Sequence, residues 1–276
     1  KVAAANELDD LGVEMIQVGF PVADDGTDAV CDRLDTTAKV TGIARAIEGD
    51  IDAAADAGVD VVQFSIPTSD RQRTSVIGVS REELTEMAVT TLDYARDSGL
   101  EVHVDAMDGF RTEPEYLNEL MEVIDTPYFG IADTVGVRTP DEVVEFLDRL
   151  DGDLPRVRVH FHRDLGVGTA NVLAAAKCGV GMADVTVGGI GERVGNVALE
   201  EVVVAGSIGS PSIDFAIDEH ALIPKSREIL DILEEPVEPN KPILGELAYE
   251  HESGMHTAAM LDDPARFRPQ ILLPVA

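Results

Sequence analysis

The chain has 276 residues, of which 45% are hydrophobic and 27% charged, so it can bury a large core and is not intrinsically disordered. Its 53 acidic and 21 basic residues give a formal net charge of −32. This balance argues against a nucleic-acid partner, because no basic stripe is available for phosphates, and no apolar run is long enough to predict a membrane span.

The acidic residues are spread over the whole chain and do not form one tail. A dispersed excess of this kind is typical of the hydrated surfaces of proteins from cells with high internal salt. The opening residues do not resemble a signal peptide, and Cys31 and Cys178 provide no disulfide framework. We therefore expect a halophilic, cytoplasmic protein.

Helical and strand-like segments alternate along the chain. Residues 1–11 have helical spacing, and between the later strands apolar residues recur every three or four positions. Ser80 with Glu83 predicts a capping box, and Pro140 after Thr139 predicts a helix start. Apolar β-type runs lie at 13–21, 38–44, 59–66, 100–107, 128–133, 156–162 and 182–189.

This alternation predicts a parallel α/β fold. Seven strands are one short of a (β/α)8 TIM barrel, and because the chain opens on a helix we expect the first strand to lie before Lys1. A doubly wound open sheet is the alternative, but no G-x-G-x-x-G motif follows a first strand. We expect the barrel over residues 1–208, and a linker with a small, mostly helical subdomain over 209–276.

Two of the six histidines, His160 and His162, end the predicted strand 156–162. Residues two apart on a strand point to the same face, and the carboxyl ends of barrel strands surround the active site. Two imidazoles beside a third protein ligand suit a divalent transition metal. A hydrogen-bonded pair inside the core is the alternative interpretation.

The glycine-rich segment "GGIGERVGN" follows the next strand, at 188–196, so it is expected at the same barrel mouth. Its glycines permit a tight turn of the backbone. Glu192 and Arg193 can pair with each other or orient a ligand, and Asn196 offers a carbonyl oxygen. An ordinary turn is the alternative.

The stretches "HFHRDLGVGTANVLAAAKCGV" and "GGIGERVGN" resemble the paired signatures H-x-H-N-D-L-G and N-G-I-G-E-R-x-G-N of the isopropylmalate, homocitrate and citramalate synthases. The segments "IQVGFP", "TSD", "ADTVG" and "YEHESGMHTAAML" follow the same order as in that family. The resemblance implies a metal-dependent enzyme on a (β/α)8 barrel that condenses acetyl-CoA with a 2-oxo acid.

The resemblance further implies that His160, His162 and Asn196 bind a divalent metal (Mg, Mn or Zn). Another ligand, an Asp of the family's first-strand signature, would lie before Lys1. The cation would polarise the carbonyl group of the 2-oxo acid, and an enolate formed from acetyl-CoA would attack it. Hydrolysis of the thioester would then make the condensation irreversible.

Four other side chains receive roles from the resemblance. Thr134, in "ADTVG", would hydrogen-bond the carboxylate of the 2-oxo acid, and Arg111 would recognise a substrate carboxylate. His256, in "SGMHTAA", would reach the barrel mouth, typically of the partner subunit in a homodimer, and assist proton transfer. Glu192 is the second candidate catalytic residue. The alternatives are a helix cap for Thr134 and a polar surface histidine for His256.

Five positions depart from the family's pattern: Gln17, Gln72, Met107, Arg163 and Gly188. Gln and Met do not exchange protons near neutral pH, so these changes alter the acid–base lining of the site. Three interpretations remain open. They are a synthase with a shifted substrate preference, a related metal-dependent lyase, and a barrel that has lost catalysis and acts as a binding subunit.

Overall fold

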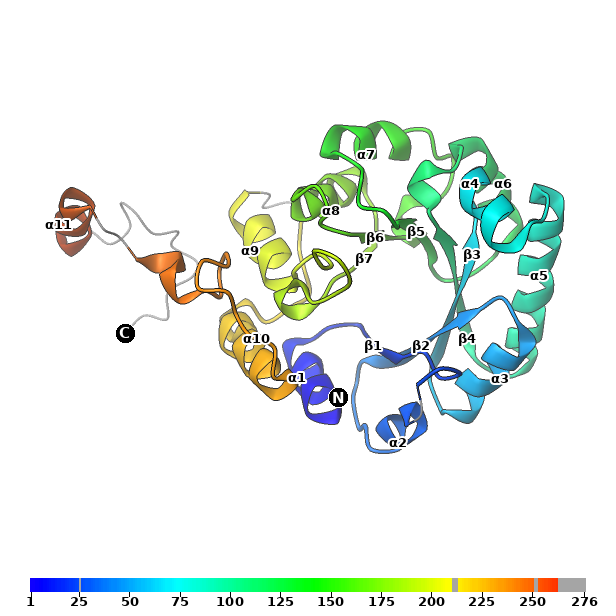
Figure 1. Cartoon of the computed structure of the whole chain (residues 1–276), viewed down its shortest axis with the longest axis horizontal. Helices are drawn as coiled ribbons and strands as arrows, with labels where there is room; N and C mark the ends of the chain where they lie inside the picture. The colour runs from blue at the N-terminus through cyan, green and yellow to red at the C-terminus, as the bar shows by residue number, and fades with distance from the viewer. Residues whose placement is uncertain (25, 210–212, 251–252, 263–276) are drawn as a thin grey trace.

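The computed structural model describes residues 1–24, 26–209, 213–250 and 253–262. Seven parallel strands form one curled sheet in chain order, and helices surround it (Figure 1). This is the TIM-barrel-like α/β fold that the sequence predicts, and each strand overlaps one predicted run. The strands are β1 (Met15–Gly19), β2 (Lys39–Arg45), β3 (Val61–Pro67), β4 (Glu101–Met107), β5 (Phe129–Asp133), β6 (Val157–Phe161) and β7 (Met182–Asp184).

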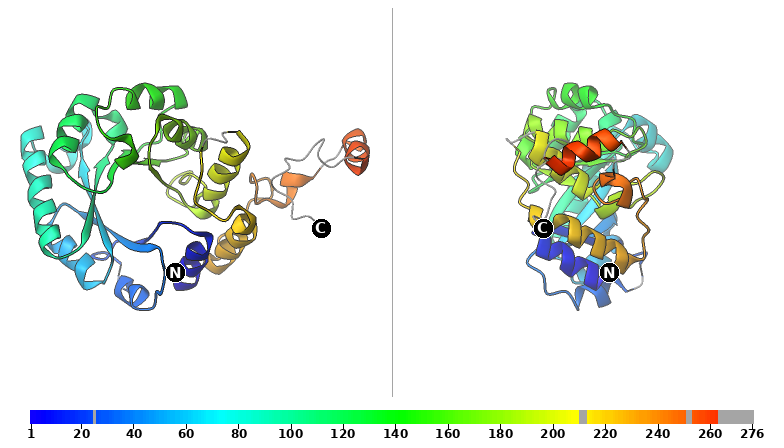
Figure 2. Two further views of the ribbon diagram at one scale, coloured as in Figure 1. Left: turned by 180° about the vertical axis from the view of Figure 1, so that it is seen from behind. Right: turned by 90° about the vertical axis from the view of Figure 1, so that its left-hand side faces the viewer.

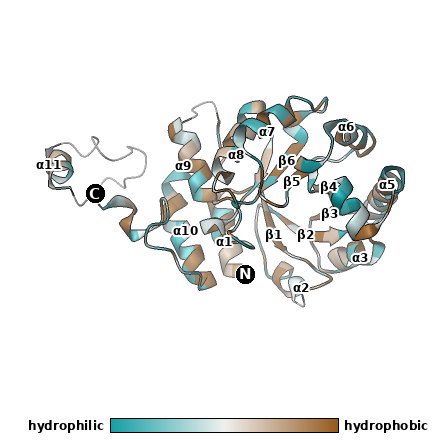
Figure 3. Ribbon diagram, turned by 45° about the horizontal axis from the view of Figure 1, so that its top comes forward, coloured by the Kyte–Doolittle hydropathy of each residue, from teal (hydrophilic) through white to brown (hydrophobic). Residues whose placement is uncertain are grey.

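The helices are amphipathic segments before, between and after the strands. Figure 3 shows mixed hydrophilic and hydrophobic residues on helices such as α5 and α10. The predicted capping box at Ser80 and Glu83 begins α5, and Pro140 occupies the first turn of α7. In the described segments, no helix combines the length and the apolar character needed to cross a bilayer. The helices are α1 (Val2–Leu11), α2 (Thr27–Cys31), α3 (Glu48–Asp56), α4 (Asp70–Gln72), α5 (Arg81–Asp97), α6 (Pro114–Val123), α7 (Pro140–Leu147), α8 (Gly168–Cys178), α9 (Leu199–Gly209), α10 (Glu219–Leu233) and α11 (Gly254–Asp262).

The two faces of each strand meet different environments. On β6, the apolar residues Val157, Val159 and Phe161 belong to the main hydrophobic core. Because side chains alternate along a strand, Arg158 and His160 point to the opposite face, into the barrel interior. The main apolar core therefore lies between strands and helices, and polar side chains line the inside of the barrel.

The strand order begins with β1 and ends with β7, and a cavity of about 640 Å³ lies beside both. Gln17 of β1 and Asp184 of β7 are among its lining residues. The eighth strand that we expect before Lys1 stays a prediction.

In the described part of the segment after residue 208, helices α10 and α11 have different surroundings. Leu222, Ile229 and Leu230 of α10 share a buried apolar cluster with residues of α1 and α9, so α10 packs on the barrel body. Helix α11 lies apart from the barrel, as Figure 1 and the left view of Figure 2 show. The predicted boundary between 1–208 and 209–276 stays a prediction.

Candidate active site at the barrel mouth

The two histidines lie together at the carboxyl end of β6. Their ring centroids are 4.8 Å apart. Nδ1 of His162 donates to the backbone carbonyl of Asp133 over 3.1 Å, and Nδ1 of His160 lies 3.3 Å from Oδ2 of Asp184. The carbonyl of Asp133 can accept only from a protonated Nδ1 of His162, and the carboxylate of Asp184 favours a proton on Nδ1 of His160. Both contacts favour the tautomer in which Nε2 presents its lone pair, which is the form of imidazole that binds a metal.

Burial favours the neutral form of one of these rings. His162 is 9% exposed, and this burial, followed by the charges of His160 and Arg193, lowers its pKa below the usual value of 6.5. The hydrogen bond to Asp133 and the charge of Glu192 act in the opposite direction and are outweighed. A neutral imidazole near pH 7 is available to a cation without first losing a proton.

Asn196 lies beside the histidines. Its backbone forms an isolated antiparallel bridge with His162, and its Nδ2 donates to the carbonyl of Ile190 over 3.1 Å. Its Oδ1 is buried and has no hydrogen-bond partner within the part of the chain that the structure describes, which is costly unless a ligand occupies that position. Two imidazole nitrogens and an unpartnered amide oxygen therefore fit a divalent cation.

The ligand set is mixed, with nitrogen and amide-oxygen donors. Over the residues that the structure describes, no group of three or more His, Cys, Asp or Glu side chains is arranged to hold a metal ion. Thus the metal assignment depends on Asn196 joining the two histidines.

Arg163, one of the departures from the family's pattern, holds the glycine-rich loop in place. Its guanidinium donates to the carbonyls of Gly189 and Val194 over 3.3 and 3.0 Å, and its backbone N–H donates to Gly195 over 3.1 Å. A Cβ at Gly189 or Gly195 would lie within 2.9 Å of this guanidinium. The guanidinium therefore lies directly against these two glycines, and Arg163 fixes the loop that carries Asn196.

Contacts with α9 and α10 explain the glycine at position 188. Its φ is +68°, a conformation that favours glycine, and a Cβ would lie 2.9 Å from Leu230 of α10. Its N–H donates over 3.0 Å to Oε2 of Glu200, a fully buried carboxylate. Leu230 of α10 therefore restricts this position to a residue without a side chain, and Glu200 of α9 holds its backbone N–H.

Glu192 lies at the rim of the site. Its Oε1 is 3.6 Å from Nε2 of His162, and its carboxylate pairs with Arg193. Arg193 also donates to Asp164 over 2.8 Å and to the carbonyl of Thr134 over 3.0 Å. The Glu192 side chain is 66% exposed. It is therefore a solvent-accessible carboxylate facing the nitrogen that is free to bind a metal.

Thr134 and Arg111 are brought together by Asp108. The Thr134 hydroxyl accepts the Asp108 N–H over 2.8 Å, and Arg111 forms two 2.7 Å bonds to the Asp108 carboxylate. Asp108 is 1% exposed, and Ser69 also donates to it. Arg111 thus already has an anionic partner, so a substrate carboxylate would contact only the remaining edge of its guanidinium.

His256 is not at the mouth of its own barrel. It lies on α11, which is set apart from the strands (Figure 2). Of the predicted site residues, the structure therefore brings together His160, His162, Asn196 and Glu192, with Thr134 next to Arg193. The role of His256 stays a prediction that requires a second subunit.

The other departures lie on several elements. Gln17 lines the cavity beside β1, and Met107 ends β4 opposite Pro67 of β3. Oε1 of Gln72, on α4, is buried without a hydrogen-bond partner. Nothing in the structure explains why Met stands at position 107.

Sequence reasoning missed three groups that support the histidines. Asp184 contacts His160, Arg158 contacts Asp184, and the carbonyl of Asp133 contacts His162. Although burial opposes ionisation, Arg158 and then His160 lower the pKa of Asp184 below its usual value. The register pairs His160 with Asp184, so an acidic residue on the neighbouring strand was the available signal.

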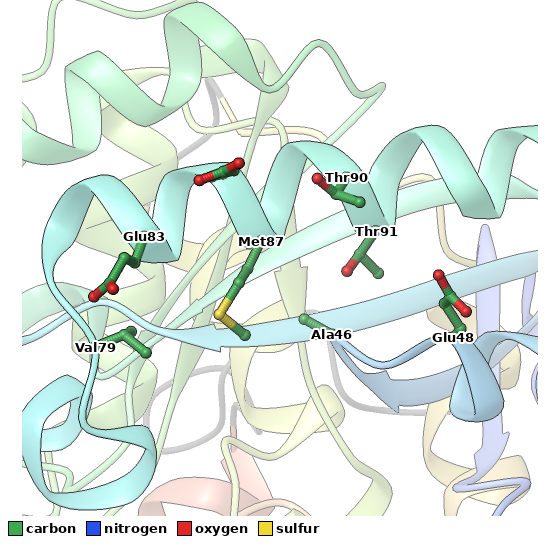
Figure 4. A pocket seen from close by; sticks show the side chains of 8 residues that line it. Ala46, Glu48, Val79, Glu83, Met87, Thr90 and Thr91 are labelled. Carbon is green, nitrogen blue, oxygen red and sulfur yellow. The ribbon is translucent and has the colours of Figure 1, made fainter.

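A second hollow, of about 510 Å³, lies away from the histidines between α5 and the residues after β2 (Figure 4). Met87 points from α5 toward Ala46, and glutamates surround it. The residues that line it are Ala46, Glu48, Val79, Glu83, Glu86, Met87, Thr90 and Thr91. This hollow shares no lining residue with the cavity beside β1 and β7.

Residues 1–228 match the family model described as HMGL-like. The chain belongs to the HMGL-like family. It is 39% identical, over 98% of its length, to a protein of Methanopyrus kandleri named "Probable 2-isopropylmalate synthase" and to homocitrate synthase AksA of the same organism. These matches cover 55% and 69% of the two relatives, so the chain spans little more than half of the first. The predicted resemblance to these synthases is confirmed.

Solved structures support the fold independently. The HMG-CoA lyase of Bacillus subtilis superposes with a TM-score of 0.74 over 86% of this chain and 87% of the lyase, at 19% sequence identity. At that identity the likeness establishes the TIM-barrel-like architecture of this family member and not its reaction.

Proposed function

We propose that this HMGL-like chain condenses acetyl-CoA with a 2-oxo acid at the mouth of its barrel, as the names of its relatives suggest. The observation that carries the proposal is the donor set at the end of β6. Nδ1 of His162 is hydrogen-bonded to the carbonyl of Asp133, and Nδ1 of His160 lies beside the carboxylate of Asp184. The buried Oδ1 of Asn196 beside them has no partner among the described residues. This arrangement suits a cation that binds a small oxygen-rich substrate.

His160, His162 and Asn196 would hold the cation, which when bound supplies Lewis-acid polarisation of a carbonyl group. Arg163 keeps Asn196 in position through the loop carbonyls. Thr134 would orient the substrate carboxylate, and Arg111 would offer its free edge to a second one. Homodimer formation would bring His256 from a second copy to the mouth, where it assists proton transfer together with Glu192.

Thiol release tests this proposal directly. The chain is incubated with Mn²⁺ or Mg²⁺, acetyl-CoA and a panel of 2-oxo acids that differ in side-chain size and charge, and free coenzyme A is measured with a thiol reagent. We expect release that depends on both the metal and one class of 2-oxo acid. His162→Gln should abolish it, whereas His220→Gln, at an exposed position of α10, is the matched control and should retain it.

Other outcomes separate the alternatives. Cleavage of a hydroxyacyl-CoA thioester without added acetyl-CoA supports a lyase and contradicts the condensation. Binding of Mn²⁺ and a 2-oxo acid without turnover supports a binding subunit. Because the chain covers only part of its relatives, the activity of the whole protein stays a proposal.

A further inference from the structure

A line of polar side chains crosses the barrel interior below the histidine pair. Lys39 of β2 pairs with Glu101 at 2.6 Å, and Glu101 lies 3.1 Å from Nε2 of His103 on β4. Nδ1 of His103 in turn accepts a hydrogen bond from Nη1 of Arg158 over 3.2 Å. Arg158 is 1% exposed, and its partner His103 is fully buried. The Arg158 side chain is therefore held inside the barrel.

Two carboxylates flank the same guanidinium. Nη2 of Arg158 pairs with Asp105, and Nε lies 3.3 Å from Oδ1 of Asp184. The contact with Asp184 is an ion pair and not a hydrogen bond, because Nε of Arg158 has no hydrogen-bond partner among the described residues. The neighbouring strand leaves room for this arrangement, because a Cβ at Gly130 would lie 2.0 Å from Oδ1 of Asp105 and 3.1 Å from Nη2 of Arg158. A buried cation held on several sides has little freedom to change its rotamer.

Asp184 connects this buried cation to the site. Its Oδ1 faces Arg158, and its Oδ2 faces Nδ1 of His160 at 3.3 Å. A carboxylate can accept from both donors at once, whereas an amide has one oxygen and would set its NH2 group against one of them. The contact keeps the proton of His160 on Nδ1 and leaves Nε2 free.

We propose that Asp184 and Arg158 are positioning residues for His160. Arg158 orients the carboxylate of Asp184, and Asp184 fixes the tautomer and ring orientation in which His160 binds a cation. The inference rests on the proposed function in one respect, that His160 is a metal ligand. Neither residue touches the substrate, and both act through the imidazole.

The test compares Asp184→Asn with Asp105→Asn in the full chain. Both substitutions remove one negative charge from Arg158, but only Asp184 contacts His160. Ring ¹⁵N chemical shifts of the metal-free protein report the tautomer of His160, assigned with a His160→Gln sample. The electron paramagnetic resonance signal of free Mn²⁺ measures the affinity of each protein for this metal.

We expect wild-type His160 to carry its proton on Nδ1. Asp184→Asn should mix the two tautomers and weaken Mn²⁺ binding about 10- to 100-fold, the usual effect of losing such a partner. Asp105→Asn should leave the tautomer and the affinity near wild type, even if its melting temperature falls.

Three results would overturn the inference: a proton on Nε2 in the wild type, unchanged tautomer and affinity in Asp184→Asn, or equal losses in both variants. The proposed function fails separately. If no 2-oxo acid triggers thiol release while the tautomer and Mn²⁺ results hold, the condensation is wrong and the positioning role stands. If the wild type binds no Mn²⁺, the metal assignment is wrong. The comparison of tautomers alone then decides whether Asp184 positions His160.

Discussion

Acidification is expected to destabilise the fold through His103. This ring is fully buried on β4, and burial, followed by the charge of Arg158, lowers its pKa from 6.5 to about 4. The unfolded chain therefore binds a proton at pH values where the folded chain does not. The stability that His103 contributes is complete above about pH 6.5 and is lost as the pH falls toward about 4. At about 1.36 kcal/mol per pH unit, the loss is at most about 3 kcal/mol.

Urea unfolding of the wild type and of His103→Gln over a pH series measures this loss. Glutamine stays neutral throughout, and all other titrating groups are common to both proteins, so the difference between the two unfolding free energies isolates His103. We expect the difference to be constant above about pH 6.5. Below that pH, the unfolding free energy of the wild type should fall relative to that of His103→Gln, by up to about 3 kcal/mol. A difference that stays flat down to about pH 4 would refute a neutral buried imidazole.

Three more perturbations test the packing, the ligand set and the charge. Gly130→Ala should lower the free energy of unfolding by about 1–3 kcal/mol, because its Cβ would lie 2.0 Å from Asp105. Gly49→Ala, in open space on α3, is the control and should be neutral or slightly stabilising in the same urea titration. Asn196→Ala should weaken Mn²⁺ binding at least about tenfold, since it removes the unpartnered Oδ1, and an unchanged affinity in the resonance titration excludes that ligand. Molar KCl should raise the melting temperature, because salt screens the self-repulsion of a −32 charge, and a constant or lower value argues against a halophilic surface.

The sequence predicts the strands well because their signal is local. Each β run is a short apolar stretch bounded by turn residues, and the caps at Ser80 and Pro140 need only neighbouring residues. The placement of His160 and His162 on one side of the barrel mouth follows from strand periodicity and parallel topology. Neither inference requires knowledge of which strand lies next to which.

The reasons for several departures are not local. Arg163 donates to the carbonyls of Gly189 and Val194 in the loop after the next strand. Gly188 is restricted because Leu230 packs over it from a helix about forty residues away. These explanations depend on contacts between distant segments, which residue periodicity does not encode.

The sequence by itself determined the alternation of strands and helices, the acidic surface and the two motifs that meet at one end of the barrel. Only the tertiary structure decided that Asp184 contacts His160 and that the carbonyl of Asp133 contacts His162. It also decided that Arg111 is already paired with Asp108, and that His256 lies away from its own barrel. The physical reason is that a motif specifies which groups are near in the chain, whereas a hydrogen bond depends on strand register and side-chain packing between elements.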